Sequence, residues 1–193
     1  MKRLSALLVL LGLLLFTALP AKADYDPDVD YMERMISAAM SGDTAAGEAA
    51  QEYRDQKITD LGLDLPAVDY GELALLSRLI FAEAGSSWLD EHWKMAVGEV
   101  ALNRVASPEF PDTLAAVVSQ PGQYSDAVVY LHPNRASVVA AQKLLEGEWV
   151  LNNPAVVFQS CARQGSGVFL ELKDSYYGST YLCFSNRMEL YEG

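Results

Sequence analysis

A carboxylic acid in apolar surroundings is the residue of this sequence best suited to acid chemistry. Glu83 closes the segment Leu73–Ala82, which is almost entirely apolar. A carboxyl group that loses water on one flank holds its proton more tightly, because burial disfavours the charged form. A carboxyl with a raised pKa can donate a proton near neutral pH. Glu83 is therefore predicted to act as a general acid.

The histidines and cysteines do not suggest metal chemistry. His92 lies on an amphipathic segment and His132 in a turn, which favours surface or capping positions for both. Cys161 and Cys183 have no partner at the spacing of zinc ligands, so neither a metal nor an organic cofactor is expected. A disulfide between the two cysteines and two unrelated thiols both fit, and the two alternatives stay open.

Two predicted helices frame Glu83. The segment Glu72–Ala84 is apolar on nearly all sides, which predicts a buried helix with Glu83 in its last turn. In Leu89–Val105, apolar residues recur at spacings of three and four, which predicts a second helix. A short helix at Thr113–Val118, a turn at Pro121-Gly122 and a helix at Asn134–Glu146 are expected to follow.

The residue types of the chain change after Gly147. Short β-branched or aromatic segments, separated by Gly, Ser and Asp, are typical of short strands. These segments are Val156–Phe158, Val168–Leu170 and Tyr181–Phe184. The sequence therefore predicts an α+β fold, with a helical front and a small antiparallel sheet behind it.

The N-terminal residues predict export. Residues 1–23 have a basic start, an apolar stretch and an Ala-x-Ala pattern ending at Ala23, which indicates a secretory signal peptide, with an uncleaved anchor as the alternative. Residues 24–65 are rich in Asp, Glu, Ala and Gly, with helical fragments at Tyr31–Met40 and Ala45–Gln56. They are expected to form an acidic, solvated helical spacer or arm. Residues 66–193 would then form one domain.

The net charge narrows the choice of partners. The chain carries a formal charge of −12. Such an acidic protein is a poor match for nucleic acid phosphates, which require patches of Lys and Arg. Anionic membranes are disfavoured for the same reason, and no stable membrane insertion is expected after signal cleavage.

Four segments in a fixed order carry a family resemblance. They are Leu76–Ala84, Ala96–Val105, Phe110–Thr113 and Gln120–Ser125. They resemble the bacterial cell wall hydrolase family of the spore cortex-lytic enzymes, and the resemblance covers about residues 70–186. It implies a secreted catalytic domain with a groove similar to that of lysozyme and lytic transglycosylases. The implied partners are peptidoglycan glycan strands, and an accessory regulator also fits.

The resemblance implies that Glu83 is the catalytic acid. It would protonate the glycosidic oxygen between N-acetylmuramic acid and N-acetylglucosamine. In a lytic transglycosylase, the same carboxylate then accepts the proton of the muramic acid C6 hydroxyl and an anhydro product forms. A muramidase would need a second carboxylate, for which Glu99 and Asp126 are candidates. Glu99 could equally be a structural acid, and the single-glutamate mechanism is favoured.

Other polar residues are predicted to bind substrate or to support the fold. An amide and a phenol on a turn suit a sugar-binding groove, and tyrosines at the surface can stack on sugar rings. Asn103 is expected to bond a neighbouring loop, and Arg104 to pair with an acid. The candidate substrate-binding residues are Gln123, Tyr124, Ser125 and, more weakly, Tyr176 and Tyr177.

Two departures from the family pattern keep other functions open. Gly85 follows Glu83-Ala84 where the family usually has an arginine, so a charge near the acid is missing. The histidine of the family's final strand is replaced by Ser179 or Thr180. An inactive peptidoglycan-binding protein and an N-acetylmuramoyl-L-alanine amidase are the alternatives. Spore cortex lysis and wall remodelling both fit an active enzyme.

Overall fold

The structure, a computed structural model, describes residues 27–162, 167–178 and 181–186. The predicted signal peptide, residues 1–23, lies outside these residues, as do Ser179 and Thr180. In chain order the elements are α2 (Pro27–Ser41), α3 (Thr44–Leu61), α4 (Tyr70–Ala84), α5 (Glu91–Ala106), α6 (Leu114–Val118), the 3₁₀-helix η1 (Asp126–Tyr130), α7 (Arg135–Leu145), β1 (Val156–Ser160), β2 (Val168–Lys173) and β3 (Tyr181–Asn186).

Side-chain caps explain where the predicted helices begin. Asp69 and Asp90 each accept a hydrogen bond from the backbone N–H three residues further on, at the starts of α4 and α5. Asn134 does the same for α7. Because Asp90 is a cap, α5 begins at Glu91 and not at Leu89 as predicted. The predicted helices are otherwise confirmed, and η1 was not predicted.

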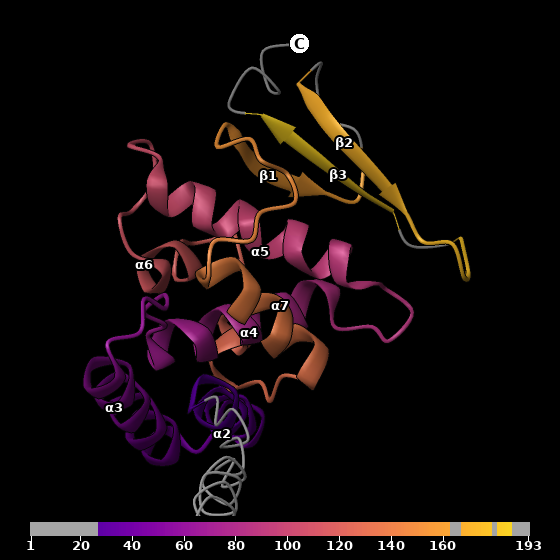
Figure 1. Cartoon of the computed structure of the whole chain (residues 1–193). Coiled ribbons are helices and arrows are strands. Elements are labelled where there is room, and N and C mark those ends of the chain that lie inside the picture. Colours follow the sequence, from indigo (N-terminus) through magenta and orange to yellow (C-terminus); the bar gives the residue numbers. More distant parts are fainter. Residues whose placement is uncertain (1–26, 163–166, 179–180, 187–193) are drawn as a thin grey trace, which may run out of the picture.

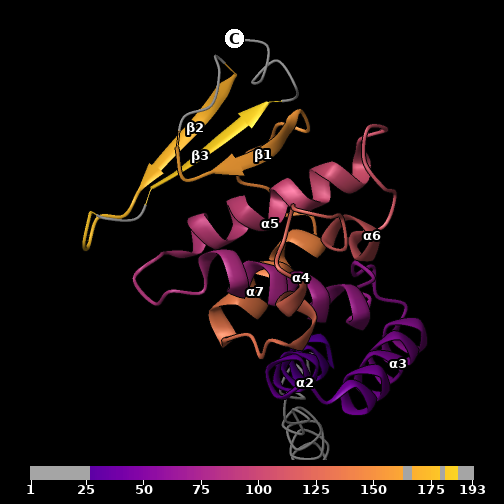
Figure 2. The same cartoon turned by 180° about the vertical axis from the view of Figure 1, so that it is seen from behind.

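Helix α5 is the central element of the molecule. It lies between the sheet on one side and α4 and α7 on the other (Figures 1 and 2). Gly98 permits this close packing, since a Cβ atom there would lie 2.6 Å from Leu144 and 2.7 Å from Ile80. One hydrophobic core runs through these helices and continues to Phe184 in the sheet.

Helices α2 and α3 are packed against the rest of the molecule. Met32, Met35 and Ile36 of α2 are buried in the main hydrophobic core. This differs from the expected solvated arm, because one face of α2 is apolar and needs a partner surface. The division of the chain at residue 65 stays a prediction.

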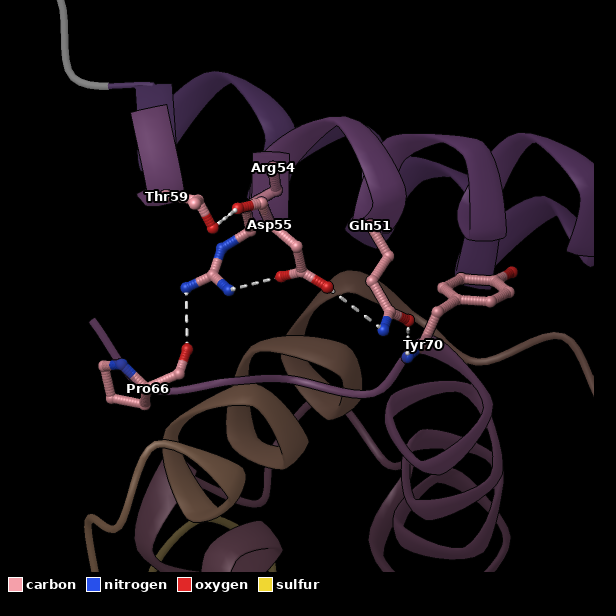
Figure 3. A network of polar contacts seen from close by, with 6 residues as sticks. All are labelled: Gln51, Arg54, Asp55, Thr59, Pro66 and Tyr70. Atoms are coloured by element: carbon pink, nitrogen blue, oxygen red, sulfur yellow. Dashed lines mark hydrogen bonds and ion pairs between the residues drawn. The ribbon is translucent and has the colours of Figure 1, made fainter. Parts of the chain in front are cut away.

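Helix α3 is fixed by polar contacts to the segment that leads into α4 (Figure 3). Arg54 is 1% exposed and donates a hydrogen bond of 3.0 Å to the carbonyl oxygen of Pro66. The side-chain oxygen of Gln51 accepts a bond of 2.6 Å from the backbone N–H of Tyr70. The start of α4 is therefore held by α3, at the end of the helix opposite Glu83.

The sheet is antiparallel in the order β1-β3-β2, with β3 in the centre. The three predicted strands are confirmed, and each extends two or three residues beyond its predicted end. Cys161 is exposed, Cys183 is buried, and both are free thiols. Helices on one side of a small antiparallel sheet confirm the predicted α+β class. Within the described residues, no helix is both long and apolar enough to cross a membrane.

Candidate functional site

Glu83 lies in the last turn of α4, as predicted. The residue is exposed to solvent, yet the surrounding chain lies close enough to raise the pKa of its carboxyl group, with burial as the main cause. A hydrogen bond from Gln159 and the positive charge of Arg104 act in the opposite direction. The carboxyl is thus reachable from solvent and holds its proton more tightly than an ordinary glutamate.

Gly85, the residue that follows α4, also constrains the position of Glu83. A Cβ atom at Gly85 would lie 2.3 Å from the carbonyl oxygen of Phe81 and 2.6 Å from its ring. Asn134 donates a hydrogen bond of 2.9 Å to the carbonyl oxygen of Gly85. Glycine is therefore required at this position, where the sequence resemblance led us to expect an arginine, because a larger residue would displace the end of the helix that carries Glu83.

Arg104 supplies a positive charge beside Glu83. It comes from α5, is 4% exposed, and its Nε donates a hydrogen bond of 2.7 Å to the carbonyl oxygen of Val157. Its guanidinium carbon lies 5.2, 5.4 and 5.6 Å from three ring centroids, all within the range of cation–π attraction. The three rings are those of Phe110, Tyr124 and Phe158.

The expected acid partner of Arg104 is therefore replaced by aromatic rings and a backbone carbonyl. The positive charge that seemed to be missing after Glu83-Ala84 is provided from the second helix. Asn103, one residue earlier, donates bonds of 3.0 Å to the carbonyl oxygens of Asn153 and Val156, which confirms its predicted structural role.

Among the predicted substrate-binding residues, Tyr124 is the one whose phenol interacts electrostatically with both Glu83 and Arg104. Burial is the main cause that raises the pKa of its phenol, while Arg104 lowers it and the negative charge of Glu83 raises it. These mutual effects place Glu83, Arg104 and Tyr124 in one electrostatic neighbourhood.

Several buried polar atoms around Glu83 have no hydrogen-bond partner in the described part of the chain. They are Nη1 of Arg104, the hydroxyl of Tyr124 and Oε1 of Gln159. The other end of the Gln159 amide lies 3.5 Å from Oε2 of Glu83. Buried polar groups are normally satisfied, so such a cluster calls for an explanation. A polar ligand with hydroxyl and amide groups would satisfy it.

Glu99 occupies very different surroundings. It is 1% exposed, and one carboxylate oxygen accepts hydrogen bonds of 2.7 and 2.8 Å from the backbone N–H groups of Val150 and Leu151. The other oxygen accepts a bond of 2.9 Å from the N–H of Asn152. These bonds favour a structural role, with partners in the loop before β1 and not Asn103 or Arg104 as considered from the sequence.

The remaining predicted residues near Tyr124 lie at the surface. Ser125 caps η1, since its hydroxyl accepts a bond of 3.2 Å from the N–H of Ala127. Gln123 and Asp126 are exposed. A substrate role for Gln123 and Ser125, and a carboxylate role for Asp126, stay predictions.

Tyr176 and Tyr177 belong to a separate cluster at the turn between β2 and β3. Their ring centroids are 4.7 Å apart, and the ring of Tyr177 lies 5.2 Å from that of Trp88. Trp88 lies in the loop between α4 and α5, which begins at Gly85, two residues after Glu83. The cluster therefore connects the sheet to the loop that follows the predicted acid.

The two histidines lie at the surface. Both His92 and His132 are exposed, as predicted. Among the side chains that the structure describes, no group of three or more His, Cys, Asp or Glu residues is placed to hold a metal ion.

Two described hollows lie away from Glu83. One, of about 470 Å³, is lined by residues of α2 and α3, including Arg34 and Tyr53. The other, of about 340 Å³, lies beside Trp149 and Asn153. Neither includes Glu83 in its lining, and the chemistry is therefore assigned from the surroundings of the carboxyl. The predicted lysozyme-like groove stays a prediction.

Sequence reasoning missed Gln159 and Trp88 and assigned Arg104 a purely structural role. Gln159 had no clear signal, because it follows the predicted strand Val156–Phe158 and is next to another polar residue, Ser160. Trp88 had a signal, because a tryptophan in a Ser- and Asp-containing loop is unusual for a core residue. The position of Arg104 depends on rings from three distant segments, which no local pattern reveals.

Comparisons with known proteins identify relatives of this chain. Residues 90–165 match the family described as Cell Wall Hydrolase. A spore cortex-lytic enzyme of Bacillus cereus is 28% identical over 107 residues, which cover 53% of this chain and 39% of the relative. The chain thus spans about two fifths of the length of the curated relatives it matches.

Two solved structures are also similar to this chain. The crystal structure of the catalytic domain of the Bacillus cereus SleB protein has a TM-score of 0.48 and 20% identity, and the match covers 63% of this chain and 95% of that one. The catalytic domain of the germination-specific lytic transglycosylase SleB from Bacillus anthracis has a TM-score of 0.47 and 20% identity, with 62% and 97% covered.

The family match confirms the resemblance over residues 90–165 of the range of about 70–186 found in the sequence. The matched range begins after Glu83 and includes Arg104, Tyr124 and Gln159. The role of Glu83 therefore depends on its surroundings and on the sequence resemblance.

Proposed function

Because residues 90–165 match the cell wall hydrolases, we propose that this protein cleaves the glycan strands of peptidoglycan outside the cytoplasm, with Glu83 as its catalytic acid. The observation that supports this most is the set of unpartnered polar atoms around Glu83. Arg104, Tyr124 and Gln159 each have a buried polar atom without a partner among the described residues. Sugar hydroxyl and acetamido groups offer the donors and acceptors that these atoms lack.

The raised pKa of Glu83 fits the first step of the reaction. The protonated carboxyl donates its proton to the glycosidic oxygen as the bond to C1 of N-acetylmuramic acid breaks. Arg104 is close enough to favour the carboxylate that remains. The C6 hydroxyl of the same sugar then attacks C1, and its proton returns to Glu83. One glycosidic bond is exchanged for the anhydro bond, and no water is consumed.

A single glutamate is favoured over a pair of carboxylates. Glycoside hydrolases that use water generally need a second carboxylate close to the bond. Both oxygens of Glu99 already accept backbone hydrogen bonds, and Asp126 is exposed on η1. The lytic transglycosylase reaction requires neither residue.

The experiment that tests this function is mass spectrometry of the fragments released from purified peptidoglycan by the full chain. Fragments with anhydromuramic ends, made by the parent and reduced about a thousandfold by Glu83→Gln, would support the proposal. Fragments with reducing ends would show that the protein hydrolyses the glycosidic bond and is not a transglycosylase. Stem peptides released without glycan cleavage would establish an amidase, and binding without release would establish an inactive binder. Vegetative wall and spore cortex, compared side by side, would identify the preferred substrate.

A further inference from the structure

We propose that Trp88, Tyr176 and Tyr177 form an aromatic platform that binds the glycan strand at a distance from the bond cleaved at Glu83. This inference rests on the proposed function and extends it to the length of glycan that the enzyme engages. The three rings are 43%, 74% and 63% exposed, and they lie in contact with one another. Exposed large apolar side chains gathered in one place indicate a binding surface.

The arrangement of the rings suits sugars. The ring of Tyr177 stands at 89° to that of Trp88 and at 79° to that of Tyr176. Ring faces are thus presented in more than one direction, and sugar rings pack their C–H groups against such faces. Tyrosine and tryptophan also offer a polar group to neighbouring hydroxyls.

The turn that carries the tyrosines is fixed by Asp174. This residue is 4% exposed, and its carboxylate accepts hydrogen bonds from three successive backbone N–H groups. They belong to Tyr176, Tyr177 and Gly178, at 3.1, 2.6 and 3.1 Å. Gly178 has a φ of +64°, which glycine adopts readily. The tyrosines therefore project from a rigid turn.

The loop that carries Trp88 is fixed as well. The buried ammonium group of Lys94 donates hydrogen bonds to the carbonyl oxygens of Ser86 and Leu89, on both sides of the tryptophan. Surfaces that are rigid before binding lose less conformational entropy when a ligand arrives. Both halves of the platform meet this condition.

The aromatic platform lies close enough to Glu83 for one glycan strand to contact both. Trp88 follows Glu83 by five residues, so their Cα atoms are at most about 18 Å apart. The strand β3, which begins after the turn of Tyr176 and Tyr177, pairs with β1, where Gln159 lies opposite Phe184. One glycan strand could therefore contact Glu83 and the platform together.

The test is calorimetric binding of oligosaccharides of alternating N-acetylglucosamine and N-acetylmuramic acid, from one disaccharide repeat to several. The full chain carries Glu83→Gln, so that no cleavage occurs. Adding Tyr177→Ala or Trp88→Ala should weaken binding of the long oligosaccharides about tenfold and leave the disaccharide unaffected. Tyr177→Phe keeps the ring and should keep the affinity. Trp149→Ala removes a tryptophan that is also 43% exposed, and should have no effect.

The outcomes separate the platform from the proposed function. If the Trp88→Ala and Tyr177→Ala variants bind oligosaccharides of every length as tightly as the protein without these changes, and the unmodified chain cleaves peptidoglycan, the platform alone is overturned. Equal weakening at every length would also overturn it, since the effect would then lie at the cleavage site or in the fold. Loss of self-association upon ring removal, with unchanged glycan affinity, would assign the surface to a second copy of the chain. A parent that neither cleaves nor binds glycan would overturn both proposals.

Discussion

Two glutamates on adjacent helices, Glu83 and Glu99, have opposite surroundings. Glu99 is buried, and both of its oxygens accept backbone hydrogen bonds of 2.7 to 2.9 Å. Glu83 is exposed and has a single long contact of 3.5 Å with Gln159. The hydrogen bonds of Glu99 tie its side chain to a loop, whereas the chain around Glu83 raises the pKa of that carboxyl and the single long hydrogen bond offsets this only in part. The difference teaches that Glu99 is built to hold a loop and Glu83 is left available to exchange a proton.

Of the substitutions that test this comparison, Glu99→Ala should have the largest effect, and the effect should be on stability. Three backbone N–H groups would lose their acceptor, and buried donors without partners are costly. The free energy of unfolding should fall by about 3 kcal/mol or more, as measured by urea denaturation. Glu91→Ala is the matched control, because its surface ion pair with Lys143 should contribute about 0–1 kcal/mol. Unchanged stability together with lost cleavage would make Glu99 a second catalytic carboxylate.

A smaller effect, on the pH dependence of cleavage, is expected from Arg104→Gln. The positive charge of Arg104 lowers the pKa of Glu83, so its removal raises that pKa further. Glu83 would then stay protonated to higher pH, and the alkaline limb of the kcat/KM profile should move upward. The rate should fall about ten- to a hundredfold, because the carboxylate left after proton transfer loses a positive charge that favours it.

Two variants control for the change at Arg104. Arg104→Lys keeps the charge and should leave the alkaline limb in place, even if the rings pack less well around it. Arg135→Gln removes an exposed arginine that pairs with Glu33, and it should change neither the rate nor the profile. An alkaline limb that stays fixed in Arg104→Gln would show that Arg104 does not act on Glu83.

The smallest effect on the rate is expected from Gln159→Leu. The amide of Gln159 lowers the pKa of Glu83 through a hydrogen bond, and this effect is larger than that of the positive charge of Arg104. Its loss should move the alkaline limb upward by at least as much as Arg104→Gln does, while kcat/KM should fall only a few-fold because no charge is removed. Gln142→Leu on α7 is the control, since its amide bonds Glu146 within the same helix. A smaller shift than that of Arg104→Gln would contradict this order of the two neighbours.

Local signals in the sequence were enough for the elements around Glu83. The apolar run before it and the aspartates at 69 and 90 define two helices, and short β-branched segments define the sheet. The acidic composition of residues 24–65 drew attention away from the helical spacing of apolar residues in α2. Met32, Met35, Ile36 and Ala39 are buried and follow helical spacing, so α2 needs a packing surface.

The surroundings of the carboxyl depend on contacts that are distant in sequence. The rings around Arg104 come from residues 110, 124 and 158, and the loop that bonds Glu99 lies at residues 150–152. Such contacts arise only when the helices and the sheet have packed. Periodicity and spacing therefore indicated a carboxyl of unusual pKa at Glu83, while the choice between Glu83 and Glu99 needed the folded chain.

The central claim is that the surroundings of Glu83 raise the pKa of its carboxyl. The most direct measurement is a ¹³C NMR titration of this carboxyl in the full chain, assigned by the signal that disappears in Glu83→Gln. We expect a pKa above the ordinary value of 4.5, and a further rise in Arg104→Gln. A pKa at or below 4.5 would contradict the claim, because Glu83 would then be an ordinary ionised surface glutamate.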